Sequence, residues 1–163
     1  AVSINFSVYQ MTNPGIVNHV LDTIAKFGLD PSNIIMEITE SIFIENFELV
    51  AKNMTDLAQA GVKFYLDDFG NGYSNLANVV GLPFSTVKMD RSLVLAMENS
   101  TKNYDLFANL VSTFKGAGLK VLVEGVETEN QDEQVKNAGV DYIQGFLYSR
   151  PVSADSCLEL LRM

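Results

Sequence analysis

Apolar runs typical of β-strands alternate with helical patterns along this chain. The helical patterns place their apolar residues on one face of residues 16–27, 47–58 and 104–114. Strand and helix in alternation predict an α/β fold, because each helix returns the chain to the start of the next parallel strand. The expected strands are residues 2–6, 34–38, 63–66, 86–89, 120–123 and 142–143.

Residues that begin and end helices support these limits. Asn13 before Pro14 predicts a helix cap and the first helical position, and Thr128 with Gln131 fits a capping box. A glycine stops the helical pattern just before several strands, which is a weak repeat of one βα unit and predicts right-handed crossovers. These glycines are Gly28, Gly61, Gly118 and Gly139.

Every expected strand carries a polar residue at or near its carboxyl end. In parallel α/β folds, and above all in barrels, these ends surround the functional site. A purely structural role would predict aliphatic residues there, because Asp, Glu and Lys are rarely buried unless they are paired. The residues are Asn5, Glu37, Asp67 with Asp68, Lys88, Glu124 and Gln144.

Asp67 and Asp68 form the most informative pair in this set. Two adjacent carboxylates repel each other unless a cation or water relieves them, and carboxylate oxygens are ligands for hard divalent cations. The same residues, followed by Gly70, also fit a solvated Asp-Gly turn with a helix cap. The polar residues on the other strands favour the metal site.

Short motifs along the chain carry a family resemblance. In this order they resemble the signature of the EAL domain, the bacterial cyclic-di-GMP phosphodiesterase. The resemblance implies a TIM-type (β/α)8 barrel with an active site at the carboxyl ends of the strands. The motifs are Ile4-Asn5-Phe6-Ser7, Glu37-Ile38-Thr39-Glu40, Asp67-Asp68-Phe69-Gly70, Lys88-Met89-Asp90-Arg91, Glu124-Gly125-Val126-Glu127-Thr128 and Gln144-Gly145-Phe146.

The chain departs from the family pattern mainly at its front. The Glu-Ala-Leu segment that names the family is missing, and about six βα units stand where a closed barrel has eight. We therefore expect an incomplete (β/α)8 barrel, formed by a single EAL-type domain over residues 1–163 that lacks its N-terminal units. Asn71 stands where the family usually has threonine, in a loop that helps to order the metals.

The resemblance also implies roles for individual residues. Asn5, Glu37 and Asp67 would hold one Mg²⁺ or Mn²⁺ ion, and Asp67 with Asp68 would help to hold a second. Glu124 would be a metal ligand or the general base for the attacking water. Lys88 would orient the nucleophile or neutralise developing charge, although it could equally be a lysine satisfied by neighbouring carboxylates. Weaker assignments are Gln144 and Asp90, as contacts to water, metal or guanine, and Glu40, as the anchor of the loop with the aspartate pair.

Composition narrows the ligands and partners. The formal net charge of −9 argues against polymeric nucleic acid, whose phosphates are bound by clustered Lys and Arg. One histidine, His19, predicted at the surface, and one cysteine make a zinc site improbable. Cys157 is predicted to be a small core residue of the last helix. The single cysteine excludes an internal disulfide and predicts a reducing, cytoplasmic location. No apolar run is long enough to cross a bilayer, so we expect no membrane contact by this segment, with any anchor of the parent protein upstream.

Three functional classes follow. The first is a metal-dependent phosphodiesterase that opens cyclic-di-GMP to the linear dinucleotide. The second is a cyclic-di-GMP receptor without catalysis, and the third is an inactive interaction scaffold, against which the intact metal ligands at all six strand ends argue. Unpaired strand edges recruit other chains, so we expect a homo-oligomer or a contact with upstream sensory domains.

Overall fold

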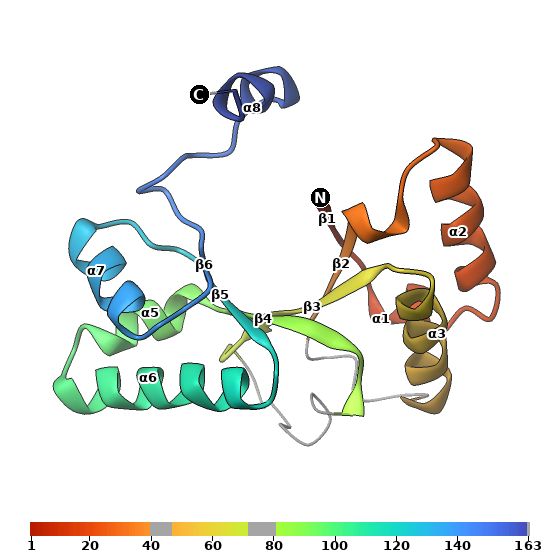
Figure 1. Cartoon of the computed structure of the whole chain (residues 1–163). Helices are drawn as coiled ribbons and strands as arrows, with labels where there is room; N and C mark the ends of the chain where they lie inside the picture. Colours follow the sequence, from red (N-terminus) through yellow and green to blue (C-terminus); the bar gives the residue numbers. More distant parts are fainter. Residues whose placement is uncertain (40–46, 72–80, 163) are drawn as a thin grey trace.

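The computed structural model describes residues 1–39, 47–71 and 81–162. Within these residues, six strands form one parallel sheet in sequence order, with one group of helices near its first strands and another near its last strands (Figure 1). The sheet stays open, with β1 and β6 as its two end strands, so the predicted incomplete (β/α) barrel is confirmed. The strands are β1 (Val2–Asn5), β2 (Ile34–Thr39), β3 (Lys63–Phe69), β4 (Phe84–Met89), β5 (Lys120–Val123) and β6 (Tyr142–Ile143).

The helices confirm the expected apolar faces and add elements that the sequence did not indicate. The short α1 (Val8–Met11) and α5 (Arg91–Met97) were not predicted. The glycines predicted to stop the helices have positive φ, from 62° at Gly28 to 107° at Gly61, which suits the left-handed turn that ends a helix. The remaining helices are α2 (Ile16–Lys26), η1 (Pro31–Asn33), α3 (Phe47–Gln59), α6 (Thr101–Gly116), α7 (Glu129–Asn137) and α8 (Ala154–Leu160).

The two predicted helix starts had different outcomes. The capping box of Thr128 and Gln131 is confirmed at the start of α7. The prediction that Asn13 caps α2 was wrong, because α2 begins at Ile16 with Gly15 as its N-cap residue. The Asn13 side chain instead accepts a hydrogen bond from the Gly15 N–H at 2.9 Å, which closes a turn ahead of the helix.

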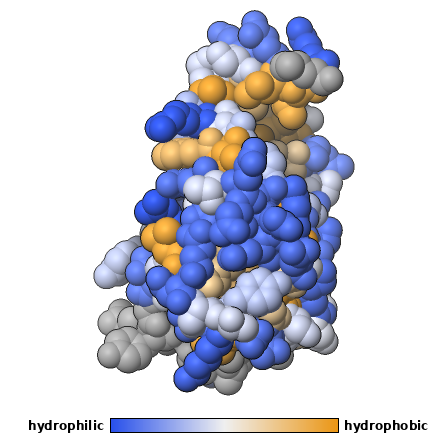
Figure 2. Space-filling model, turned by 90° about the vertical axis from the view of Figure 1, so that its left-hand side faces the viewer, coloured by the Kyte–Doolittle hydropathy of each residue, from blue (hydrophilic) through white to orange (hydrophobic). Residues whose placement is uncertain are grey.

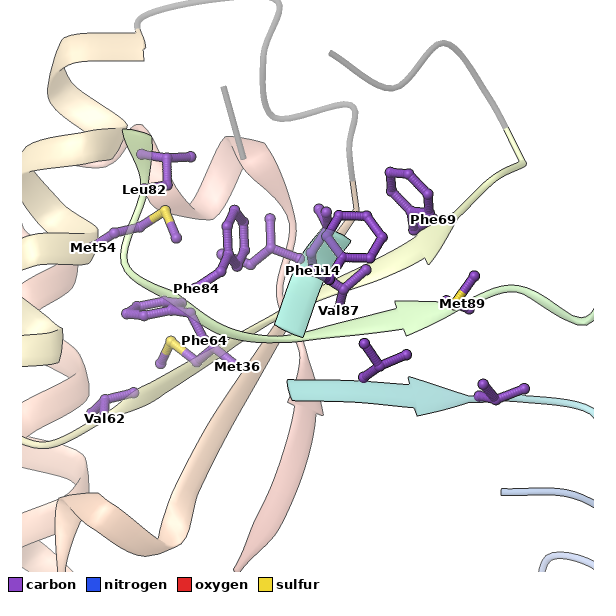
Figure 3. Packing of buried hydrophobic residues seen from close by; sticks show 14 of the residues in the cluster. Met36, Met54, Val62, Phe64, Phe69, Leu82, Phe84, Val87, Met89 and Phe114 are labelled. Atoms are coloured by element: carbon purple, nitrogen blue, oxygen red, sulfur yellow. The ribbon is translucent and has the colours of Figure 1, made fainter. Parts of the chain in front are cut away.

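The hydrophobic core lies between the sheet and the helices. Met36, Phe64 and Phe84 of three neighbouring strands pack toward Met54 of α3 (Figure 3). On the other half of the sheet, the Phe69 and Phe114 rings meet edge to face with centroids 4.9 Å apart. Because side chains alternate between the faces of a strand, every second residue is turned away from this core. That alternation positions the polar residues of the site.

The C-terminal helix corrects one sequence prediction. Cys157, expected in the core, is exposed, and no residue of α8 is buried. Leu158 and Leu160 are about half exposed. The helix follows an extended segment that carries it away from the sheet (Figure 1), and hydrophobic residues gather at this end of the molecule (Figure 2). An apolar pattern on a helix therefore did not establish burial here.

Two expectations about the surface can be compared with the described residues. His19 is exposed on α2, as predicted. Among the described residues, no helix combines the length and the apolar character needed to span a bilayer.

Asn53→Ala is expected to destabilise the protein by about 1–3 kcal/mol, the usual effect of leaving buried hydrogen-bonding groups unpaired. Asn53 of α3 is buried, and its amide donates to the carbonyl oxygens of Met11 at 2.8 Å and Asn13 at 3.3 Å. Urea unfolding measures the change. The control is Asn18→Ala at an exposed position of α2, which has the same change in helix propensity. Equal effects of the two variants would contradict the structural role of Asn53.

Candidate active site

Three strands point charged side chains away from the core and toward one another. Lys88 of β4 and Glu37 of β2 each lie between core residues of their own strand, so the two-residue period turns both side chains to the opposite face. Asp67 of β3 lies between these strands in the sheet. Glu124 follows directly after β5, at the carboxyl edge. The sequence predicted this convergence at the strand ends.

The Lys88 ammonium joins three carboxylates. Its Nζ lies 2.7 Å from Asp67 Oδ1, 2.8 Å from Glu124 Oε1 and 3.0 Å from Glu37 Oε2. Only 6% of the Lys88 side chain is exposed, against 12% for Asp67 and 21% for Glu124. Bulk water weakens ion pairs at a protein surface, and these three ion pairs are shielded from it.

A β-bulge brings the aspartate pair together on one side of the sheet. Neighbouring residues of a regular strand point to opposite faces, so Asp67 and Asp68 would normally be separated. Between Leu66 and Phe69, however, β3 contains one residue more than the facing segment of β4. Asp68 takes a left-handed conformation with φ 56°, which aspartate tolerates better than most residues. One oxygen each from Asp67, Asp68 and Glu124 consequently lies within 4.8 Å of the others.

The pKa values of Glu124 and Lys88 both lie above their ordinary values, for different reasons. Burial raises the pKa of Glu124 above its ordinary value, although its hydrogen bond with Lys88 acts in the opposite direction. Burial alone would lower the pKa of Lys88, but the hydrogen bonds to Asp67, Glu124 and Glu37 outweigh it and raise that pKa. Lys88 is therefore a permanent cation at neutral pH, and Glu124 holds a proton more readily than an exposed glutamate.

Gly145 fixes the position of Gln144 beside Glu124. A side chain at Gly145 would place its Cβ 1.9 Å from the Val126 carbonyl oxygen, so the segment after β6 lies directly against the segment after β5. The Val126 N–H donates to the Gln144 carbonyl at 3.2 Å, and the Gln144 N–H donates to Val123 of β5 at 2.8 Å. The motif glycine is thus required by close contact between backbones.

A cavity of about 830 Å³ extends from Glu124 toward α8. Its volume falls within the range of small-molecule sites, roughly 300–1,000 Å³. Arg91 and Arg150 line it, with the Arg150 guanidinium 4.7 Å from the Phe146 ring centroid. An aromatic ring beside a guanidinium suits flat, anionic ligands. Arg91 and Phe146 belong to the family motifs and Arg150 lies outside them, and the sequence pattern gave none of the three a role.

Of the remaining predicted site residues, Asn5 and Gln144 lie near the cluster or the cavity, and Asp90 caps a helix. Asn5 ends β1 in register with Glu37, and Gln144 lines the cavity. Asp90 caps α5, where its carboxylate accepts from the Ser92 N–H at 2.8 Å. Partial burial favours a higher pKa for Asp90, but the hydrogen bonds from Ser92 lower it overall. Glu40 lies outside the described residues.

Comparison with known proteins places this chain in a family. The model of the EAL domain matches residues 1–151. The bifunctional diguanylate cyclase/cyclic di-GMP phosphodiesterase MucR of Pseudomonas aeruginosa is 32% identical over 157 residues, which cover 96% of this chain and 23% of MucR. The chain spans about a fifth to a quarter of the length of such curated relatives.

Solved structures agree with the sequence match. A complex of the MucR phosphodiesterase with c-di-GMP has a TM-score of 0.86 at 32% identity and covers 95% of this chain and 63% of that chain. BlrP1 of Klebsiella pneumoniae, solved with manganese and cyclic-di-GMP, has a TM-score of 0.83 at 32% identity and covers 91% of this chain and 38% of that chain. With its ordered motifs and its open parallel barrel, this chain belongs to the EAL domain family.

Proposed function

We propose that this chain carries the catalytic carboxylates of a metal-dependent phosphodiesterase that hydrolyses cyclic-di-GMP to the linear dinucleotide. The observation that carries the proposal is the convergence of Asp67, Asp68 and Glu124 within 4.8 Å, next to a cavity of nucleotide size. The family match and the cyclic-di-GMP complexes of its solved members support the same substrate.

The donor set fits Mg²⁺ or Mn²⁺. Carboxylate oxygens are hard ligands that these ions prefer, and the cluster contains neither thiolate nor imidazole. We propose Asp67, Asp68 and Glu124 as ligands, with Glu37 and Asn5 completing the set for two ions. Two such ions, when bound, would activate a water molecule and neutralise charge on the phosphate oxygens. The manganese complex of BlrP1 supports the choice of metal.

Residues of the chain would then divide the remaining tasks. Glu124, with its raised pKa, would accept the proton of the attacking water if it acts as the general base, and otherwise would serve as a ligand. The water oxygen would form the new bond to phosphorus while the bond to the ribose oxygen breaks, and that oxygen would take a proton from bulk water. Arg91 and Arg150 would attract the phosphates, and Gln144 and Phe146 would contact the base. Lys88 would hold the carboxylates in place.

Glu124→Ala is expected to separate binding from cleavage. Removal of the base or ligand should lower kcat in Mg²⁺ by at least about a hundredfold, the lower end of what a general base contributes. The Kd for cyclic-di-GMP, measured by calorimetry in Ca²⁺, should change by less than about threefold, because Asp67 and Asp68 would still hold a cation and the arginines of the cavity would still bind the phosphates. Glu133→Ala, at an exposed position of α7, is the control and should keep full activity.

The outcomes of this experiment distinguish the functional classes. Equal losses in binding and in rate would place Glu124 in substrate recognition rather than in catalysis. Saturable binding by the unaltered chain without any cleavage would make it a receptor. If the unaltered chain did not bind cyclic-di-GMP at all, only the interaction scaffold would remain of the three functional classes.

The wider context of the domain is also a proposal. Val2 and Ile4 of the end strand β1 are 63% and 48% exposed, and an apolar open edge favours pairing with another chain. A homo-oligomer or a contact with sensory domains would cover this edge. Light scattering on the pure chain would distinguish a monomer from such an assembly.

A further inference from the structure

Lys88 uses its full hydrogen-bonding capacity on carboxylates. A lysine ammonium has three N–H donors and no acceptor. All three donors have partners at 2.7–3.0 Å, which come from β2, from β3 and from the residue after β5. A donor for a substrate oxygen would become available only if one of these ion pairs broke. This geometry argues against direct contact between Lys88 and the substrate.

The partners of Lys88 overlap with the candidate metal ligands. Asp67 and Glu124 contact the ammonium and also belong to the group that could hold a metal ion. The described part of the cluster holds four carboxylates, those of Glu37, Asp67, Asp68 and Glu124, and one cationic side chain, that of Lys88. A divalent cation that enters this cluster is attracted by the excess negative charge and repelled by the ammonium beside it.

We propose that Lys88 is the resident counter-cation of the carboxylate cluster. It stabilises the fold when no divalent cation is bound, and it limits the affinity with which one binds. Lys88 is thus a positioning residue. It keeps the carboxylates together, and it keeps metal binding weak enough for the ion to leave the site. This inference rests on the proposed metal site, because a cluster that binds no metal has no affinity to limit.

The test compares Lys88→Met with Lys52→Met in the full chain. Both substitutions replace a lysine that forms an ion pair, but Lys52 pairs with Asp56 at the surface, where its side chain is 68% exposed. Thermal unfolding in excess EDTA should show a melting temperature lower by about 5 °C or more for Lys88→Met, because buried carboxylates lose their partner. The Lys52→Met variant should melt within about 1 °C of the unaltered chain.

Calorimetry with Mn²⁺ alone tests the second half of the inference. Lys88→Met should bind Mn²⁺ at least about tenfold more tightly, because the repulsion between the ammonium and the incoming ion is removed. A role in which Lys88 only orders the ligands predicts the opposite, a weaker affinity. Unchanged or weaker Mn²⁺ binding by the variant would therefore overturn the inference while leaving the proposed function intact.

Two further comparisons keep the outcomes separate. No saturable Mn²⁺ binding by the unaltered chain would contradict the proposed function and, with it, the effect of Lys88 on metal affinity. If Lys88→Met fails to fold, the double variant Lys88→Met/Glu37→Gln removes one of the repelling carboxylates and should recover a cooperative melting transition. A double variant no more stable than Lys88→Met would show that the charges are uncoupled, which overturns the counter-cation role.

Discussion

Asp67→Asn is expected to lower kcat/KM for cyclic-di-GMP hydrolysis in Mn²⁺ by at least about a hundredfold. Loss of a residue that only hydrogen-bonds to a metal ligand lowers metal affinity or activity by about 10–100-fold, and loss of a ligand should cost at least as much. Asp67 belongs to the candidate metal group and also accepts a hydrogen bond from Lys88. The substitution keeps the size of the side chain and an acceptor oxygen, so the fold should remain. It removes the negative charge that would draw a cation between the strands. Rates of product formation at saturating Mn²⁺ provide the measurement.

Matched variants make the result specific. Glu37→Gln should reduce the rate in the same way, since Glu37 shares Lys88 with Asp67. Asp56→Asn makes the same chemical change in a surface ion pair of α3 and should leave the rate unaltered. Circular dichroism confirms that each variant is folded. Full turnover by Asp67→Asn would remove the two-metal proposal, whatever the other variants do.

The periodicity of the sequence predicted the sheet and the edge at which the site lies. The strands β2 to β5 each carry core residues with a polar residue at or just after the carboxyl end, and this pattern survives folding because one face of the sheet packs on helices. Glu37, Lys88 and Glu124 were therefore expected at one edge, and the ion pairs of Lys88 bring them together there.

The geometry within the site depended on features without a sequence signal. A strict period of two would separate Asp67 from Asp68, and only the bulge in β3 unites them. The three ion pairs of Lys88 join residues far apart in sequence, from position 37 to position 124. The cavity beside Glu124 depends on the close approach of two loops. Local propensities do not determine such long-range contacts.

Burial of the last helix was the clearest failure of pattern reasoning. Leu158 and Leu160 suggested a buried face around Cys157, yet all three residues are exposed on α8. Apolar residues show which face of a helix can be buried, and tertiary contacts decide whether it is. A helix of seven residues has little stability of its own, so packing governs its place.

Gly145→Ala is expected to destabilise the protein by about 2–3 kcal/mol, a typical loss when a methyl group is forced into occupied space. The added Cβ would lie 1.9 Å from the carbonyl oxygen and 2.4 Å from the nitrogen of Val126. These are backbone atoms, which cannot rotate away as a side chain would. The hydrogen bonds between Val126 and the Gln144 and Leu147 backbones hold the two segments in contact. Urea unfolding gives the free energy of unfolding.

Gly145→Ala should also displace residues of the active site. The segment that must move carries Gln144 and lies against the loop that begins at Glu124. Hydrolysis should therefore fall even at temperatures at which the variant is folded. The control is Gly116→Ala at the end of α6, where a Cβ meets no atom within 4 Å. That change should be neutral or should stabilise the helix by up to about 1 kcal/mol. If Gly145→Ala matched the control in both stability and rate, the two loops could separate without consequence, and close contact at Gly145 would not position the site.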